Sequence, residues 1–219
     1  MLPVTATTLA FNGVRLEPLA AGHADGLRAA AEDGQIWTLR VTWVPGPQQV
    51  GEYIASALAT PNRLAFAVID AASGAVIGTT SYHNIAVDID RVEIGHTWYA
   101  KSRQRSGVNT SCKLMLLAHA FNTLGCAVIG LRTDNLNHAS QAAIERLGAR
   151  KDGVIRHHAA RRDGSVRDTV IYSILRSEWL GIESALRDRL HLHAHSSQAS
   201  QASQASQTTY FPSEPLPPC

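Results

Sequence analysis

One stretch of this sequence, from Val92 to Ser140, constrains the fold more than any other. It begins with the apolar, β-branched and aromatic residues 92–99, which predict a buried strand. A polar loop with a single glycine, Gly107, follows. Apolar residues then recur at helical spacing as far as Leu124, and Gly125 stands where a helix C-cap is expected. The stretch therefore predicts a strand, a loop and a helix in succession.

A loop that leads into a helix N-terminus has the chemistry of an anion site. The first backbone N–H groups of a helix lack partners within the helix, and the helix dipole places partial positive charge there. Gln104 and Arg105 add side-chain donors, and Gly107 allows a ligand to approach the backbone closely. An ordinary connecting loop is the alternative, because glycine-containing turns between a strand and a helix are common.

The loop and its neighbours resemble a known family. The run Gln104-Arg105-Ser106-Gly107-Val108-Asn109 is similar to the Gln/Arg-x-x-Gly-x-Gly/Ala pyrophosphate loop of the GCN5-related N-acetyltransferases (GNAT). The segments 137–140 (Asn-His-Ala-Ser) and 144–149 resemble the part that closes their acetyl-CoA site. The segments 93–99 and 167–170 resemble the branch that acetylates protein N-termini, named for the ribosomal-protein alanine and serine acetyltransferases. The resemblance covers residues 14–190, and it departs at Asn109, where the family has a small residue.

The resemblance implies an α+β fold, with a central mixed, mostly antiparallel sheet flanked by helices. A strand–helix–strand unit brings 127–133 parallel to 92–99 by a right-handed crossover. The family further implies that these two strands splay apart at one end and hold the pantetheine arm of acetyl-CoA in the gap. The residues that the resemblance places around this cosubstrate are Thr97, Trp98, Tyr99, Gln104, Arg105, Ser106, Gly107, Val108, Asn109, Thr110, Asn137 and Ser140.

Two residues are the candidates for catalysis. Glu93 is proposed as the general base, because several family members carry a glutamate on this strand. Strict alternation would place Glu93 on the same face as Thr97 and Tyr99. The alternative for Glu93 is a structural ion pair or hydrogen bond, for example with Arg91 or Arg132. Ser140 is the family's candidate for protonating the leaving thiolate, and it could instead cap a helix.

The acceptor side has weaker candidates. Trp43 lies in a proline-containing loop that arches over the acceptor in the resembling family, and packing against the sheet is its alternative. His96 and His83 are the next candidates for the base after Glu93, and His83 is also a candidate for contact with the acceptor, although a lone strand histidine usually serves packing. Asn137 is expected to bond the pantetheine amides, to cap a helix, or to do both.

The remaining elements are predicted from periodicity and from glycine and proline positions. Residues 1–12 are expected to form an extension, 13–190 the acetyltransferase domain, and 191–219, with its Gln-Ala-Ser repeats, a disordered tail. Within the domain we expect an edge strand at 13–19, helices at 21–32, 48–58, 138–147 and 177–190, strands at 63–70 and 75–83, and a hairpin formed by 153–158 and 166–175.

Composition excludes several classes of function. The chain has 219 residues, 45% of them hydrophobic, and a net charge of +2, which suits one globular domain and gives no electrostatic case for nucleic acid or a membrane. Without a targeting or membrane-spanning segment, a cytoplasmic location is the expectation. Cys112 and Cys126 are expected to be buried free thiols, Cys219 completes no disulfide framework, and no metal site is expected.

The sequence thus predicts an N-acetyltransferase that moves an acetyl group from acetyl-CoA to a primary amine, foremost a protein N-terminal α-amine. Such an amine, with a reference pKa of about 7.7–8.0, needs little help to lose its proton. The alternatives are a small amine or antibiotic as acceptor, which would require a narrower and more acidic groove, and a non-catalytic module that binds acyl-CoA. A homodimer is expected by analogy.

Overall fold

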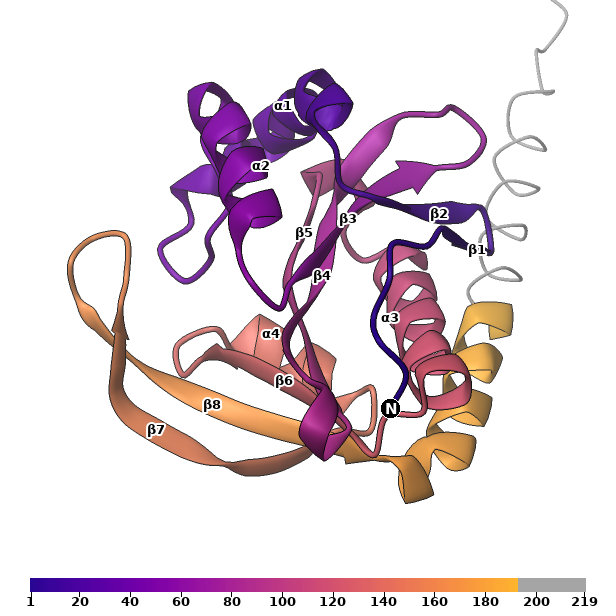
Figure 1. The fold of residues 1–219 in the computed structure, drawn as a ribbon. Coiled ribbons are helices and arrows are strands. Elements are labelled where there is room, and N and C mark those ends of the chain that lie inside the picture. The colour runs from indigo at the N-terminus through magenta and orange to yellow at the C-terminus, as the bar shows by residue number, and fades with distance from the viewer. Residues whose placement is uncertain (193–219) are drawn as a thin grey trace, which may run out of the picture.

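The computed structural model describes residues 1–192. Eight strands form one sheet in the order β1-β2-β3-β4-β5-β6-β8-β7 (Figure 1). The strands are β1 (Leu9–Phe11), β2 (Val14–Pro18), β3 (Leu64–Asp70), β4 (Val76–Ala86), β5 (Arg91–Tyr99), β6 (Val128–Asp134), β7 (Arg150–Ala160) and β8 (Val166–Leu175). The helices are α1 (Ala24–Glu32), α2 (Val50–Ala59), α3 (Val108–Ala118) and α4 (His138–Glu145), followed by a C-terminal helix over 179–192.

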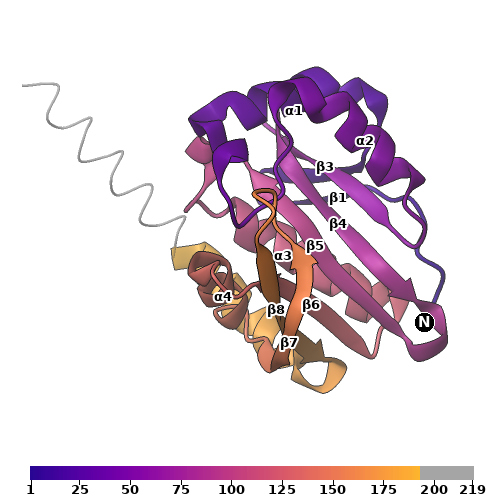
Figure 2. The same ribbon diagram turned by 90° about the vertical axis from the view of Figure 1, so that its left-hand side faces the viewer.

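Helices cover both faces of this sheet. Figures 1 and 2 show α1 and α2 on one face and α3 with the C-terminal helix on the other. Each face has its own apolar core. Phe66, Tyr82 and Ile129 are buried on the α3 side, whereas Leu27 and Trp98 are buried on the α1–α2 side. The predicted α+β architecture, a mixed and mostly antiparallel sheet between helices, is confirmed.

The two strands β5 and β6 form the one parallel pair within residues 1–192, and they pair over a short distance. Their register includes Arg91 with Val128, Val92 with Ile129, and Glu93 with Gly130. Beyond Glu93, β5 continues to Tyr99 without a β6 partner, while β6 stays paired with β8 to its end. Figure 1 shows the two parts of the sheet diverging from this point. The splay implied by the family resemblance is therefore present.

A β-bulge interrupts β5 beyond the splay. Ser81 of β4 pairs with Gly95 of β5, and Thr79 pairs with Trp98. The chain therefore advances by three residues on β5 while it advances by two on β4. The extra residue leaves His96 with a φ of +48°. The bulge reverses the alternation: Thr97 contacts α3 through Lys113, whereas Trp98 enters the α1–α2 core. The predicted single face for Glu93, Thr97 and Tyr99 is therefore wrong.

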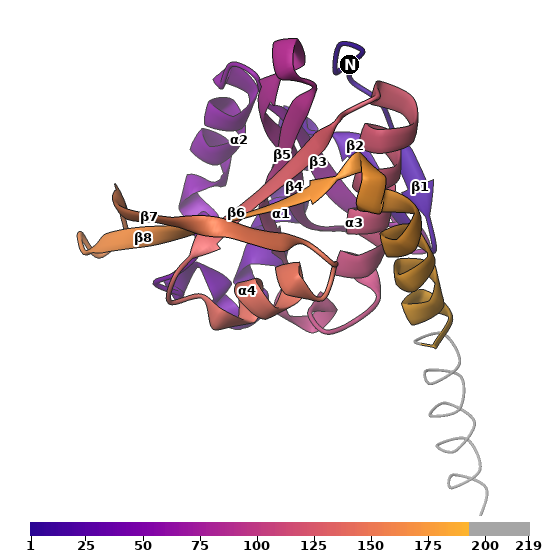
Figure 3. The same cartoon turned by 90° about the horizontal axis from the view of Figure 1, so that it is seen from below.

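The chain ends also differ from the prediction. The strand predicted at an edge, β2, pairs with both β3 and β1, so residues assigned to an N-terminal extension complete the sheet. Leu2 donates its backbone N–H to the Leu124 carbonyl. Residues 191–192, assigned to the tail, continue the C-terminal helix, and the rest of that tail lies outside the described residues. Figure 3 shows the β7–β8 hairpin projecting from the body on the side away from this helix.

The central helix follows the sequence pattern closely. α3 begins at Val108, and Gly107 is its N-cap. A π-helical turn over His119–Leu124 extends it, and Gly125, at φ +81°, ends it as predicted. The buried free thiols predicted at Cys112 and Cys126 are confirmed.

Candidate active site

The loop before α3 is shaped by its own side chains. Gln104 Nε2 donates to the Tyr99 carbonyl at 3.2 Å, and Ser106 Oγ donates to the Arg103 carbonyl at 2.7 Å. Ser106 Oγ also accepts the Val108 N–H at 3.3 Å. Gln104 and Ser106 therefore hold the loop, and the following backbone N–H groups at the α3 N-terminus are left to meet an anion.

Gly107 lies at the rim of a crevice. With Ser106 and Val108 it lines a cavity of about 290 Å³ that is shared with the β1–β2 turn. Its φ of −67° is ordinary, so no turn geometry requires glycine here. A Cβ at this position would meet only Leu190 at 3.5 Å and Asn12 at 3.8 Å, which are ordinary contacts. The local fold would therefore accept a side chain at position 107.

The start of α4 lies across the splay. Asn137 is the N-cap of this helix, and its Oδ1 accepts the Ser140 N–H at 3.0 Å. Its Nδ2 lies 3.5 Å from the Val41 carbonyl, which joins α4 to the loop between α1 and α2. The capping alternative for Asn137 is thus confirmed. Ser140 is half-buried, and its N–H, rather than its hydroxyl, completes the cap.

Glu93 is paired where β5 and β6 part. Its carboxylate accepts two hydrogen bonds from Arg132 of β6, at 2.6 and 2.5 Å, and its side chain is 8% exposed. Burial alone would raise the pKa of Glu93, but the bonds and the charge of Arg132 outweigh burial and lower it. Gly130 provides the space, since a Cβ there would lie 2.7 Å from Glu93 Cγ. The ion pair considered as the alternative for Glu93 therefore exists.

His83 is the nearest titratable neighbour of this pair. Its Nε2 lies 3.9 Å from Glu93 Oε2, and its ring meets that of His96 edge to face, with 4.9 Å between centroids. Burial lowers the pKa of His83 to about 4, although the Glu93 charge acts in the opposite direction. His83 is therefore neutral near pH 7 and can accept a proton.

The acceptor loop, residues 37–46, carries an exposed aromatic ring. Trp43 is 59% exposed, so the alternative that it packs against the sheet is wrong. The Arg162 guanidinium, from the β7–β8 turn, lies 5.4 Å from the centroid of the Trp43 ring. Arg162 also donates to the carbonyls of Trp37 and Val44. The turn between β7 and β8 thus holds this loop in place.

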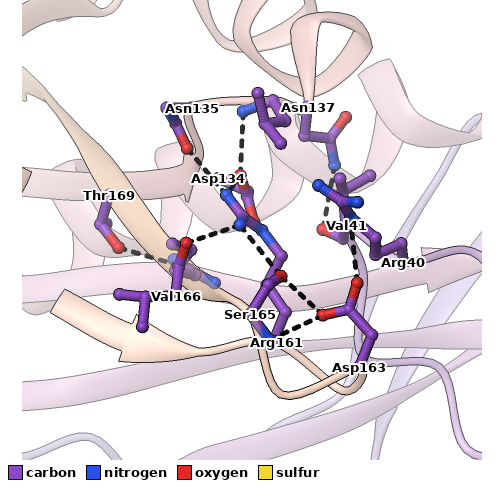
Figure 4. A network of polar contacts seen from close by, with 12 residues as sticks. Arg40, Val41, Asp134, Asn135, Asn137, Arg161, Asp163, Ser165, Val166 and Thr169 are labelled. Carbon is purple, nitrogen blue, oxygen red and sulfur yellow. Dashed lines mark hydrogen bonds and ion pairs between the residues drawn. The ribbon is translucent and has the colours of Figure 1, made fainter. Parts of the chain in front are cut away.

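Further polar contacts join the same turn to the end of β6 (Figure 4). Arg161 pairs with Asp134 through hydrogen bonds of 2.7 and 2.9 Å, and both residues are buried. Arg40 of the acceptor loop pairs with Asp163 of the turn at 3.3 Å. The acceptor loop, the β6–α4 connection and the β7–β8 turn therefore form one connected rim.

Lys113 is an unexpected buried cation under the bulge. It is 6% exposed, its Nζ donates to Thr97 Oγ1 at 3.1 Å, and it forms no ion pair among residues 1–192. Thr97 Oγ1 in turn bonds Thr80 Oγ1 at 2.8 Å. Burial lowers the pKa of Lys113 to about 8. Its ammonium thus holds the bulged part of β5 in place, although burying this charge costs solvation free energy.

Replacing this lysine changes the pH dependence of stability. Because the pKa of Lys113 is near 8 when folded and about 10.4 when unfolded, the unfolded chain binds the proton more tightly, so stability rises with pH between these values. The unfolding free energy of the wild type should rise by about 1.5 kcal/mol between pH 8 and about pH 9.5 relative to Lys113→Met. Urea unfolding at both pH values measures this difference; parallel pH dependences would contradict it.

Several residues of the site have no sequence signal strong enough to single them out. Arg132 appeared only as a candidate partner for Glu93, and Lys113 directly precedes the apolar run 114–118 of the central helix, which was the one available hint. No such hint marked Arg63, just before β3, or Arg161 and Arg162 in the β7–β8 turn.

Among residues 1–192 no group of three metal-ligating side chains is present, and none of the helices there has the length and apolar character of a membrane span.

Comparison with known proteins agrees with this arrangement. The family of acetyltransferase (GNAT) domains matches residues 14–150, more than half of the chain. This protein therefore belongs to the GNAT acetyltransferase family.

Individual proteins of known sequence or structure show how far the similarity extends. The chain is 32% identical over 114 residues to "Putative ribosomal N-acetyltransferase YdaF" of Bacillus subtilis (strain 168), a match that covers 49% of this chain and 58% of YdaF. A GCN5-related N-acetyltransferase from Brucella melitensis superposes with a TM-score of 0.78 at 31% identity, over 85% of this chain and 86% of that one. Mycobacterium smegmatis RimJ, solved with CoA-disulfide, has a TM-score of 0.69 at 20% identity, over 85% and 95% of the two chains, which shows a shared fold.

Proposed function

We propose that this protein transfers the acetyl group of acetyl-CoA to the α-amine of a protein N-terminus. The observation that carries the proposal is the part of β5 beyond Glu93, whose edge towards β6 has no partner strand and which lies between the α3 N-terminus and the cluster of Glu93 and His83. Free backbone groups on β5 suit the amides of pantetheine, and the α3 N-terminus suits its diphosphate. The structure of Mycobacterium smegmatis RimJ in complex with CoA-disulfide supports this use of the fold.

Acetyl-CoA would supply an activated acyl group, and the residues of the chain would hold and orient it. In this proposal Gln104, Arg105 and Ser106 shape the diphosphate loop, and residues 107–110 contribute the backbone there. Thr97, Trp98 and Tyr99 present the backbone of β5, and Asn137 holds the arm from the opposite side. Tyr99 also donates its hydroxyl to Asn109 Oδ1 at 3.3 Å, which gives the departure at Asn109 a role in joining β5 to α3.

The acceptor amine needs to lose one proton as it attacks. Glu93 is the proposed base, and it would act through water or through the neutral imidazole of His83, 3.9 Å away. Its lowered pKa makes it a weak base, which suffices for an α-amine whose own pKa is about 7.7–8.0. Ser140 would return a proton to the leaving thiolate.

The surroundings of the site favour a peptide over a cationic antibiotic. The rim carries Arg40 and Arg162, and the acidic residues near them, Asp134 and Asp163, are already paired with arginines. The narrow, acidic groove expected for a small cationic amine is thus not what these residues provide. Trp43, exposed on the same rim, would contact the acceptor. The similarity to YdaF, which is named as a ribosomal N-acetyltransferase, supports this choice. The homodimer and the cytoplasmic location stay predictions.

The test is to incubate the protein with acetyl-CoA and a set of peptides with free N-termini, alongside small amines and aminoglycosides. We expect mass spectrometry to find one added acetyl group on a peptide α-amine. Acetylation of the small amines alone would assign the protein to the alternative acceptor class. Binding of acetyl-CoA without transfer to any amine would favour the non-catalytic module.

Removing the Ser140 hydroxyl tests its proposed role. Ser140→Ala should lower kcat by about a hundredfold or more, the usual contribution of a positioned proton donor, and should leave the KM for acetyl-CoA nearly unchanged. The helix cap should survive, because it uses the backbone N–H of residue 140. Steady-state kinetics at several pH values measures the effect. An unchanged kcat would remove Ser140 from the chemistry.

A further inference from the structure

Arg63 is a cation without a counter-charge on the acceptor side of the sheet. It lies just before β3, is half-buried, and forms no ion pair among residues 1–192. Its Nε donates to Ser81 Oγ at 3.1 Å, whereas its Nη2 is buried and has no hydrogen-bond partner in the described chain. Buried donors almost always have partners, so an orphaned guanidinium nitrogen indicates that something else bonds it.

The position of Arg63 links it to the proposed chemistry. Ser81 of β4 accepts a hydrogen bond from Arg63. It pairs with Gly95 of β5, next to the bulge at His96. The charge of Arg63 also contributes to the lowered pKa of His83, after the larger effect of burial. His96 is exposed, so this region is open to an incoming acceptor. Arg63 therefore lies beside His83 and His96, which would border the attacking amine in the proposed reaction.

A second orphaned donor belongs to the same cluster. The Arg63 guanidinium lies 5.9 Å from the centroid of the Tyr53 ring, and the Trp98 ring meets Tyr53 edge to face at 6.4 Å. Trp98 Nε1 is buried and, like Arg63 Nη2, has no partner within residues 1–192. Tyr53 itself is fixed by a bond of 2.8 Å between its hydroxyl and Thr79. Two unpaired N–H donors around one ring suit a ligand with oxygen acceptors.

The nearby carboxylate does not neutralise Arg63. Glu93 is already bonded twice by Arg132, and His83 is neutral near pH 7. One positive charge thus remains uncompensated at this place. A guanidinium binds a carboxylate strongly, because two parallel N–H groups match the two oxygens.

We propose that Arg63 selects the acceptor by binding a carboxylate carried by one of its first two residues. The inference rests on the proposed peptide acceptor and adds a specificity to it: N-termini that begin with, or continue into, aspartate or glutamate. Arg63 would bind substrate and take no part in proton transfer.

The experiment compares pairs of peptides that differ only by Glu or Gln, and Asp or Asn, at the first or the second residue. The wild type should show a kcat/KM about tenfold or more higher for the acidic member of at least one pair, as expected for one charge-assisted hydrogen-bonded contact. Arg63→Met should remove this preference by lowering kcat/KM for the acidic peptide alone. Arg63→Lys should retain part of it. Arg187→Met, which removes a surface ion pair with Glu183, is the matched control and should change neither value.

The outcomes separate the inference from the proposed function. Equal rates for acidic and amide peptides with the wild type would overturn the role of Arg63 and leave the acetyltransferase intact. The same preference retained in a folded Arg63→Met would also overturn it. Absence of acetylation of every peptide would contradict the peptide acceptor and the inference together. Because each ratio is taken within one protein preparation, partial unfolding of a variant cannot imitate a lost preference.

Discussion

Arg132→Met should destabilise the protein by about 3 kcal/mol at pH 7, as breaking a buried ion pair from one side usually does. The variant leaves the Glu93 carboxylate, 8% exposed, without the two hydrogen bonds that it accepts in the wild type. Urea unfolding at pH 7 measures the loss. Arg150→Met is the matched control: its partner Glu178 is an acidic residue as well, but the arginine is 80% exposed, so about 0.5 kcal/mol or less should be lost.

The unfolding free energy that Arg132→Met loses should depend on pH in a defined direction. In the wild type the pKa of Glu93 is lowered, so its stabilisation is present above the unfolded value and is lost as the pH falls through the folded value. In Arg132→Met burial, which raises that pKa, is opposed only by the smaller effects of His83 and Asn84, so the pKa should rise and a neutral Glu93 needs no ionic partner. The difference between the two proteins should therefore be largest near neutral pH and smallest near pH 4. A difference that grows towards acid would contradict the account.

A double variant separates the structural and the catalytic role of Glu93. Glu93→Gln with Arg132→Met removes both charges and should recover much of the lost stability, because no unpaired ion remains. If Glu93 is the base, this folded variant should still lose acetyl transfer. Retained transfer at wild-type rates would leave Glu93 with the ion pair as its only role.

Gly107→Glu should sharply reduce the stabilisation of the protein by acetyl-CoA. A glutamate at the N-cap of α3 puts a negative charge where the diphosphate is proposed to bind, and we expect the affinity to fall at least about tenfold. The fold should not suffer, because a Cβ at residue 107 meets only ordinary contacts and the helix dipole favours an acid there. Loss of binding would thus report on the loop itself.

Thermal unfolding with and without acetyl-CoA measures this effect, since a ligand that binds only the native state raises the Tm. Gly181→Glu is the matched control, because Gly181 lies in the C-terminal helix with open space around it. Acetyl-CoA should raise the Tm of the wild type and of Gly181→Glu by similar amounts, and that of Gly107→Glu by much less. An equal rise in all three would place the diphosphate away from the α3 N-terminus.

Much of the fold could be predicted from the sequence because local patterns determine it. The apolar period from Leu114 to Leu124, with Gly125 after it, predicted the central helix, and the apolar run at 127–133 predicted its parallel strand. The splay required the family resemblance, because no residue pattern marks where two parallel strands stop pairing. The bulge at His96 could not be foreseen, since a single residue with positive φ leaves no periodic trace.

The site was predictable in part for the same reason. Contiguous motifs such as 104–110 and 137–140 carry their own geometry, whereas the pairs Glu93–Arg132 and Asp134–Arg161 join residues far apart in the chain. Arg63 and Lys113 are notable only because their neighbours lack a carboxylate, which is a property of the folded chain. The predicted edge strand failed because β1, only three residues long, was too short to recognise.

Calorimetric titration of the wild-type protein with acetyl-CoA tests the central claim most directly. The account predicts saturable binding with one molecule per chain, and competition by free CoA, since the diphosphate and pantetheine provide the contacts. A folded protein that gives no binding heat at several temperatures would contradict the acetyl-CoA site, and with it the proposed transfer.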